Sequence, residues 1–472
     1  MKKRRKLRVI CTTILLILIY EFGGILIGYS NQPKVSESFK QEFDYRSFYG
    51  DQVGTERACI IEENQDALIE RLRMIENAKK EIILSSFEFR TDKSGKDILA
   101  ALIRASERGV DVKIIVDGIS AFNNMINNEY FKVASSCDGI EIRIYNQIDV
   151  LKPWKTMGRM HDKYLIVDEE VYLLGGRNTY NYFLSDSGYK NYDRDVLVYN
   201  TQKKNKEASV YVVKQYFESV WNSKDTRKYT SSTRISSKKI KQAEKELEAI
   251  YNANKEIFGE QLEAIDYKKI TYKTNKISLL SNPITTGSKE PTVFYGLGEL
   301  MTHAKKTVDI HTPYIICNNY MYDTLNKISE SVPNAKIMTN SLANNGNPFG
   351  AMDYKKNKKK IIDTGLDVYE YDGGISYHAK SITIDDELAI VGSFNLDMRS
   401  VYLDTELMIV IDSKEVTSQL QGYMNKYENE SLHALTETAY DESTGIQAKE
   451  ISKKRKNRMK LISYLYPLRF LM

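Results

Sequence analysis

One pattern of histidine, lysine, aspartate, glycine and asparagine occurs twice in the chain at the same spacing. The two copies are His161, Lys163, Asp168, Gly175-Gly176 and Asn178, and His378, Lys380, Asp385, Gly392-Ser393 and Asn395. In both, lysine follows histidine by two positions, aspartate follows lysine by five, and the first glycine follows aspartate by seven. Imidazoles can attack or donate protons, and ammonium groups can hold an anion. Because the chain has only five histidines, the repeat predicts one active site built from two halves.

The residues around each motif predict strands that position these side chains. Residues 164–167 and 381–384 follow the His-x-Lys triplets as short apolar runs, and residues 171–174 and 388–391 lead into the glycine turns. Successive side chains of a strand point to opposite faces, so the histidine and lysine share a face. The glycine turn permits a tight return that brings the asparagine beside them.

The repeat extends beyond the motifs. Helical spacing over residues 66–78 and 98–108 alternates with apolar runs over 81–89 and 110–116, which is typical of a βαβ unit. Residues 304–310 echo 78–84 at an offset of 226, and the motif histidines are offset by 217. We therefore expect an α/β fold of two similar halves, each a mixed, largely parallel sheet flanked by helices, packed pseudo-symmetrically around one site.

This pattern divides the chain into six segments. They are 1–30, a basic N-terminus and transmembrane anchor; 31–57, a tether; 58–225, the first half; 226–268, a charged helical linker; 269–432, the second half; and 433–472, a basic amphipathic tail.

Basic residues gather at the two ends of the chain. Residues 2–8 hold six lysines and arginines, and residues 453–460 hold six more. Since the formal net charge is +5, the rest of the chain outside these two runs carries a net charge of −7. A mildly acidic body disfavours a broad track for DNA or RNA, so we expect no nucleic-acid partner.

Val9–Tyr29 is apolar apart from Glu21 and predicts an uncleaved membrane anchor. Its basic end would stay in the cytoplasm, which places the catalytic halves on the extracytoplasmic side of the cell membrane. A cleaved secretory signal is the alternative, although no small-x-small site precedes Asn31. At the other end, leucines and aromatic residues over 461–471 favour a second, interfacial contact with the membrane, and a disordered end is the alternative.

The four cysteines indicate neither a metal site nor a disulfide framework. Cys11, Cys59, Cys137 and Cys317 form no C-x-x-C pair and have no histidine partners at metal spacing. We expect no metal and no cofactor.

The two motifs resemble the signature of the phospholipase D superfamily, H-x-K-x4-D-x6-G-[SG]-x-N in duplicate, and the resemblance covers about residues 60–430. Residues 339–343 (TNSLA), 392–400 (GSFNLDMRS) and 109–112 (GVDV) are similar more narrowly to bacterial cardiolipin synthases of the C-type subgroup. Two positions depart from the pattern: Gly176 replaces a serine that is more typical of the first copy, and Asp404 stands where asparagine is common.

The resemblance implies a mechanism without metal. His161 would attack phosphorus and form a phosphohistidine, and His378 would protonate the leaving alcohol. Each imidazole would be oriented by a carboxylate of the opposite half, Glu406 for His161 and Asp193 for His378, with Asp195 as an alternative to Asp193. The motif aspartates Asp168 and Asp385 would mainly support the site. The residues expected to hold the phosphate are Lys163, Asn178, Lys380, Ser393 and Asn395.

The activity we expect is that of a membrane-anchored phosphatidyltransferase. It would move a phosphatidyl group to a lipid alcohol, giving cardiolipin when phosphatidylglycerol is both donor and acceptor. A phospholipase D-type hydrolase or a nuclease of the same superfamily is the alternative, and a catalytically silent membrane scaffold is a third reading. The expected partners are phospholipids and the membrane itself.

Overall fold

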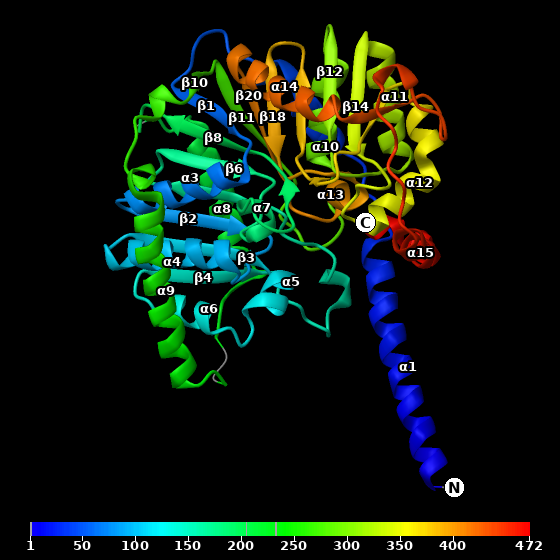
Figure 1. The fold of residues 1–472 in the computed structure, drawn as a ribbon. Helices are drawn as coiled ribbons and strands as arrows, with labels where there is room; N and C mark the ends of the chain where they lie inside the picture. Colours follow the sequence, from blue (N-terminus) through cyan, green and yellow to red (C-terminus); the bar gives the residue numbers. More distant parts are fainter. Residues whose placement is uncertain (1, 204, 232–233) are drawn as a thin grey trace.

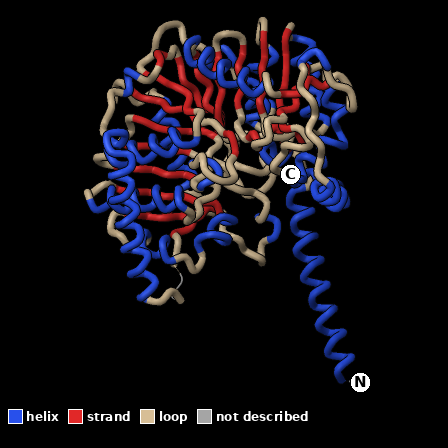
Figure 2. Tube along the Cα trace, in the orientation of Figure 1, coloured by secondary structure: helices blue, strands red, loops and turns tan. Residues whose placement is uncertain are grey.

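The computed structural model describes residues 2–203, 205–231 and 234–472, which form two α/β halves and one long projecting helix (Figure 1). Within these ranges the two large sheets have nine and eight strands. Figure 2 shows helices on the outer side of both sheets and loops where the two halves meet. The predicted α/β fold of two similar halves is therefore confirmed.

The first half is built on a sheet of order β10-β1-β8-β6-β5-β2-β3-β4-β9. The strands are β1 Glu56–Ile61, β2 Glu81–Ser86, β3 Asp111–Asp117, β4 Ile140–Tyr145, β5 Tyr164–Val167, β6 Val171–Gly175, β8 Asp195–Asn200, β9 Thr226–Lys228 and β10 Tyr272–Lys273. One face is covered by α3 Asn64–Asn77, α4 Lys93–Glu107, α6 Glu129–Ala134 and α9 Ser237–Phe258. Their apolar residues make the core of this half.

The second half repeats this plan with the order β11-β20-β18-β17-β12-β14-β15-β21. The strands are β11 Lys276–Ser281, β12 Thr307–His311, β14 Asn334–Asn340, β15 Asp367–Tyr371, β17 Ser381–Ile384, β18 Leu388–Gly392, β20 Leu407–Asp412 and β21 Ser431–Ala434. The outer helices are α10 Thr292–Thr302, α11 Asn319–Ser331 and α12 Pro348–Ile362. Helices α8 Ser209–Trp221 and α14 Lys414–Glu428 join residues of both sheets in one shared core between the halves.

Both sheets are mixed, as predicted, but their parallel part is smaller than predicted. In the described chain the parallel pairings within these sheets are β2–β3 and β3–β4 in the first and β12–β14 and β14–β15 in the second. The motif strands β5–β6 and β17–β18 are antiparallel hairpins. A turn of three residues can only reverse the chain, so the strands that carry the chemistry pair antiparallel.

Residues 31–57 were expected to form a tether, but they fold against the second half. Helix α2 (Glu37–Glu42) and the 3-10 turn η1 (Tyr45–Phe48) bring Phe43 and Phe48 onto its core. The Phe43 ring lies 5.6 Å from that of Tyr295 on α10. Because buried aromatic rings contribute large apolar areas, this segment is a packed strap.

The predicted linker and tail also belong to the folded body. Within residues 226–268, β9 extends the first sheet and α9 packs along α4 and α6. The boundary predicted at residue 433 falls inside β21, which is the edge strand of the second sheet. Beyond it, α15 (Lys453–Ile462) and the 3-10 segment η7 (Ser463–Leu471) pack on α12, where Arg469 pairs with Asp353 at 2.7 Å.

Helix α1 (Lys2–Tyr29) leaves the body as a single rod (Figure 1). Residues Arg4–Tyr29 are long and apolar enough to cross a membrane, and no other helix of the described residues meets that test. The last residue of the helix is fixed at the junction of the halves. Its hydroxyl, that of Tyr29, donates to the carbonyl of Thr286 at 2.7 Å and accepts the N–H groups of Met157 and Gly158.

Candidate active site

Two backbone hydrogen bonds between the halves position the histidines. The His161 N–H donates to the carbonyl of Thr405 at 3.3 Å, and the His378 N–H donates to the carbonyl of Tyr192 at 2.6 Å. Thr405 and Tyr192 each precede the predicted carboxylate of their own half. The same contact, made twice, therefore places each histidine beside the carboxylate of the opposite half.

The structure brings the two predicted pairs together. His161 Nδ1 lies 2.9 Å from Glu406 Oε1, and His378 Nδ1 lies 2.6 Å from Asp193 Oδ2. Asp195, the alternative to Asp193, instead accepts a hydrogen bond from Arg71 at 2.8 Å. With Nδ1 held by a carboxylate, Nε2 of each ring is the atom available for chemistry.

Glu406 is surrounded by hydroxyl groups. Ser400 Oγ donates to its Oε1 at 2.6 Å, and the Ser393 hydroxyl donates to its Oε2. Burial, together with the negative charge of Asp404, raises the pKa of Glu406 well above its usual value despite the opposing charge of Lys163. Burial and the positive charge of Lys163 also push the pKa of His161 well below 6.5, so this imidazole is neutral.

Asp193 is surrounded by positively charged groups, whereas Glu406 is surrounded by hydroxyl groups. It accepts the N–H of Arg194 at 2.8 Å, and it lies so close to Gly176 that a Cβ there would be 2.1 Å from Oδ1. Burial alone would raise its pKa, but Lys380 and His378 outweigh burial and hold it below the usual range. Asp193 is therefore ionised. Burial and Lys380 lower the pKa of His378 to about 4, and the charge of Asp193 opposes them.

Two buried lysines face the histidines. Lys163 donates to the carbonyl of His161, and Lys380 donates to that of His378 at 2.5 Å and lies 2.7 Å from His378 Nδ1. Burial lowers the pKa of Lys163 to about 7 and that of Lys380 to about 8. A bound anion would stabilise both ammonium groups and raise these pKa values.

The three polar residues predicted to hold phosphate differ in placement. Asn178 lines the cleft between the histidines, and its Oδ1 accepts the N–H of Glu88 at 3.1 Å. Asn395 is buried, and its Oδ1 has no hydrogen-bond partner among the described residues. Ser393 differs from the prediction, because its buried hydroxyl donates to Glu406 and so supports a carboxylate in this structure.

Asp168 and Asp385 lie at the far ends of the motif strands from the histidines. Asp168 accepts the N–H groups of Lys79, Lys80 and Glu81, and Asp385 accepts the matching three of residues 305–307. Both adopt left-handed conformations, with φ of 56° and 51°. These contacts hold the start of β2 and β12 against the motif hairpins, which gives both aspartates a supporting role and places them outside the reacting centre.

A cleft of about 290 Å³ opens between the two histidines. Its walls are rich in aromatic and amide side chains. The cleft is lined by Phe87, Tyr180, Tyr182, Phe183, Tyr189, Tyr314, Asn178, Asn191, Asn340, Asn345 and Asn347, among others. Phe87 packs edge-on against His161 at 5.2 Å, and Phe183 against His378 at 5.1 Å. Sequence reasoning missed these two rings and Ser400, because none of them belongs to the repeated motif.

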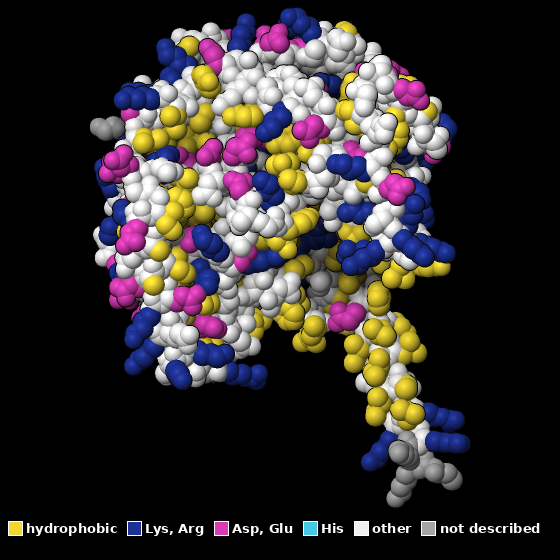
Figure 3. Space-filling view, in the orientation of Figure 1, with side chains coloured by type: hydrophobic (Ala, Val, Ile, Leu, Met, Phe, Trp, Pro, Cys, Tyr) yellow, Lys and Arg dark blue, Asp and Glu magenta, His cyan; other side chains and the backbone are white. Residues whose placement is uncertain are grey.

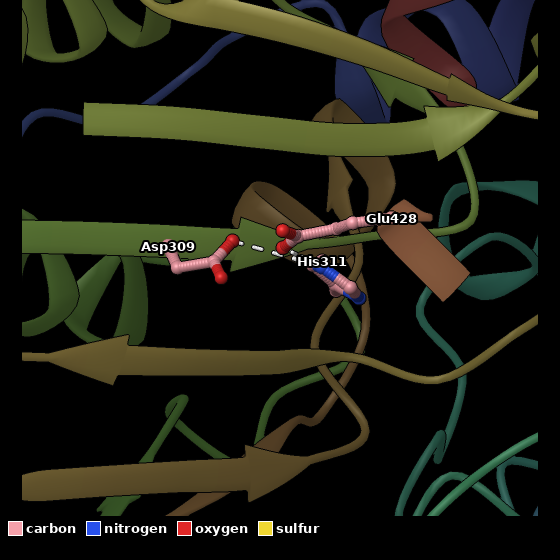
Figure 4. A group of neighbouring side chains, drawn as sticks. All are labelled: Asp309, His311 and Glu428. Atoms are coloured by element: carbon pink, nitrogen blue, oxygen red, sulfur yellow. Dashed lines mark hydrogen bonds and ion pairs between the residues drawn. The ribbon is translucent and has the colours of Figure 1, made fainter. Parts of the chain in front are cut away.

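Figure 4 shows the group of described residues that comes nearest to a metal site, Asp309 and His311 on β12 and Glu428 at the end of α14. Lys336 Nζ lies 3.2 Å from Asp309 Oδ2 and also pairs with Glu428. The ammonium group of Lys336 therefore offsets part of the negative charge of this cluster. His311 in turn contacts the hydroxyl of Tyr377, the residue before His378, so this cluster supports the backbone of the second motif.

Each of the two similar α/β halves supplies the carboxylate that holds the histidine of the other half. This arrangement defines a phospholipase D-like protein. The family model described as "Cardiolipin synthase, PLD-like domain" matches residues 72–221 and 297–427, one segment in each half. The chain belongs to this family, and the resemblance predicted from the two motifs is confirmed.

The chain is also similar to individual proteins of known sequence and structure. An uncharacterized protein of Helicobacter pylori is 26% identical over 418 residues, which are 80% of each chain. A cardiolipin synthase of Listeria monocytogenes is 25% identical over 366 residues, which are 76% of this chain and 65% of that protein. The crystal structure of a phosphatidylserine synthase from Haemophilus influenzae shares the fold with a TM-score of 0.63 and 16% identity, covering 90% of this chain and 97% of that one.

Proposed function

We propose that the protein is a membrane-anchored phosphatidyltransferase that makes cardiolipin. The observation that carries the proposal is the pair of histidines whose Nδ1 atoms are held by Glu406 and Asp193, with Lys163 and Lys380 buried beside them. This arrangement provides a nucleophile, a proton donor and two cations for one phosphodiester. The cardiolipin synthase named among the relatives indicates the class of substrate.

The environments of the two histidines support a division of roles. Burial and the charge of Lys163 hold the pKa of His161 well below 6.5, and its Nδ1 is held by Glu406, so its Nε2 carries a lone pair that can attack phosphorus. His378 lies against the ionised Asp193, which can stabilise an imidazolium. Binding of an anionic phosphodiester between the lysines raises the pKa of His378 and prepares it to donate.

In the first step His161 Nε2 forms a bond to phosphorus, and the bond from phosphorus to the oxygen of the leaving alcohol breaks. The leaving oxygen takes a proton from His378. In the second step neutral His378 removes the hydroxyl proton of the acceptor lipid, whose oxygen attacks phosphorus and releases His161. Two molecules of phosphatidylglycerol then give one cardiolipin and one glycerol, with a single phosphodiester exchanged for another.

The apolar helix α1 supports the proposed location. Residues Arg4–Tyr29 would anchor the chain in the cell membrane with their basic end in the cytoplasm, which puts both halves on the extracytoplasmic side. Protease added to intact spheroplasts should then digest the body and leave a control cytoplasmic protein whole. A body that is protected until the cells are lysed would reverse the proposed side.

The activity is tested with the purified full-length chain in phosphatidylglycerol vesicles with chelator present. We expect cardiolipin and glycerol in equal amounts, and no product from the His161→Ala variant. Phosphatidic acid and glycerol as the products would indicate a hydrolase, and cleavage of DNA at low salt with no lipid product would indicate a nuclease. Unchanged cardiolipin output from His161→Ala would refute the mechanism.

A further inference from the structure

A loop of the first half packs along the last turns of helix α1. The loop, residues 148–156, follows β4 and contains the short turn η3 (Pro153–Lys155). Tyr20 donates its hydroxyl to the carbonyl of Leu151 at 2.7 Å. One and two turns later, Gly24 and Gly28 approach Pro153 and Trp154 so closely that a Cβ would be 2.4 Å and 2.9 Å from them.

The position of this contact along α1 determines how deep the loop would lie in a membrane that α1 spans. The apolar stretch from Val9 to Ile27 spans 19 residues, which is about 28 Å of helix and close to the thickness of a hydrocarbon core. Tyr20 and Gly24 lie inside this stretch. Once α1 spans a bilayer, Leu151 and Pro153 therefore lie at the level of the lipid, beside the part of α1 that occupies the outer hydrocarbon layer nearest the body.

The loop presents apolar side chains to its surroundings at this level. Leu151 is 72% exposed, Val150 66% and Trp154 44%. Phe122 and Ile126, from the segment after β3, are also largely exposed. A hollow of about 380 Å³ joins Phe122 to Val150 and Leu151, and its wall includes Lys224 and Arg227. Figure 3 shows hydrophobic side chains on the lower rim of the body, on the side that faces α1.

We propose that this surface is a second membrane contact, which enters the interfacial layer of an anionic phospholipid bilayer beside α1. It consists of Phe122, Ile126, Val150, Leu151 and Trp154, with Lys224 and Arg227 on its rim. Apolar and tryptophan side chains are favoured at the boundary between headgroups and acyl chains, and exposed cations are attracted to lipid phosphates. The proposal rests on the membrane-spanning role of α1 given under the proposed function.

The two tryptophans of the chain allow a direct test. Trp154 is 44% exposed in the loop, whereas Trp221 is 6% exposed in the core between the halves. We would reconstitute the full-length Trp221→Phe variant in vesicles that contain phosphatidylglycerol and lipids brominated at defined acyl carbons. Fluorescence of Trp154 should fall at least about twofold, and bromine near the headgroup should quench more than bromine near the chain end. The Trp154→Phe variant, which keeps only Trp221, should show little quenching.

A pair of matched substitutions separates lipid contact from packing against α1. In the Trp221→Phe background, Leu151→Asp should relieve most of the quenching of Trp154, because a charge at this depth lifts the loop from the lipid. Ile257→Asp, at a 65% exposed apolar residue at the far end of α9, should leave it unchanged. Quenching of Trp154 no stronger than that of Trp221, or quenching unaffected by Leu151→Asp, would overturn the proposal.

Two further measurements keep this result apart from the proposed function. Resistance of the chain to alkaline carbonate extraction reports the anchoring of α1 whatever the loop does. Cardiolipin production with an unquenched Trp154 would reject only the membrane contact, and a quenched Trp154 without lipid product would reject only the proposed activity.

Discussion

The two halves of the molecule have the same backbone arrangement at the active site, but they hold their carboxylates, Glu406 and Asp193, in different ways. In the second half, two serine hydroxyls hold Glu406, whose pKa is raised by burial. In the first half, Asp193 lies against the bare backbone of Gly176, and Lys380 and His378 keep it ionised. A duplicated fold can therefore keep its geometry while each copy surrounds its carboxylate with different groups. Four predictions test whether this difference sets the roles of the histidines.

The largest effect should come from the histidines themselves. His161→Ala should abolish the transfer and the covalent intermediate. His378→Ala should slow the natural reaction roughly 10³- to 10⁴-fold, because it removes general acid catalysis, but much of the activity should return with a phosphodiester whose leaving group is a nitrophenol, which needs no proton. Trapping of labelled phosphoprotein in rapid-quench experiments distinguishes the two variants. Rescue of His161→Ala by the activated substrate, with none for His378→Ala, would reverse the roles.

The carboxylates should follow, with unequal losses. Asp193→Asn removes the ionised group beside the proton donor, and we expect kcat to fall roughly 10³- to 10⁴-fold. Glu406→Gln removes a hydrogen-bond acceptor with a raised pKa, so a smaller loss of roughly 10- to 100-fold is expected. Steady-state kinetics on phosphatidylglycerol vesicles give both numbers, and circular dichroism checks that the variants fold. Equal losses would show that the difference between the halves has no catalytic meaning.

Making the halves alike at one position should cost activity. Gly176→Ser would put a side chain where Asp193 Oδ1 now lies, and the resulting displacement of Asp193 should reduce kcat about 10²-fold. Ser393→Ala, the matched change in the second half, removes one hydrogen bond from Glu406 and should reduce kcat only about tenfold. If Gly176→Ser is as active as the parent chain, the close approach of Asp193 is not needed.

The smallest effect concerns pH. Because burial lowers the pKa of Lys163 to about 7 and that of Lys380 to about 8, kcat/KM should fall as pH rises through this range and the ammonium charges are lost. Lys163→Arg keeps its charge at all these pH values, so the fall should begin about one pH unit higher. Lys380→Arg should leave the start of the fall near pH 7. An unchanged pH profile for Lys163→Arg would assign the decline to another group.

Much of the site could be predicted from the sequence because its chemistry imposes a fixed spacing on the chain. The strands at 164–167 and 381–384 have the predicted bounds, and the predicted pairs of His161 with Glu406 and His378 with Asp193 lie in contact. Those pairs came from the resemblance to a family. No spacing rule links residues 245 and 185 positions apart.

The remainder depends on contacts that leave no local pattern. The strap of residues 31–57 looked polar and aperiodic, since Phe43 finds its partner Tyr295 some 250 residues away. Ser393 occupies the motif position of a phosphate ligand, and only the three-dimensional structure shows that Glu406 takes its hydroxyl. The antiparallel pairing of β1 with β8 and of β11 with β20 was also hidden, because an apolar run has the same composition in either direction.

The fixing of Tyr29 at the junction of the halves has a kinetic consequence. With this hydroxyl bonded to Thr286, Met157 and Gly158, the catalytic body cannot swing on a flexible stalk. With α1 in a bilayer, the body would stay at one height relative to the membrane and meet lipids only as they diffuse in its plane. The rate would then depend on the mole fraction of substrate in the surface, and diluting the vesicles in buffer would leave it unchanged.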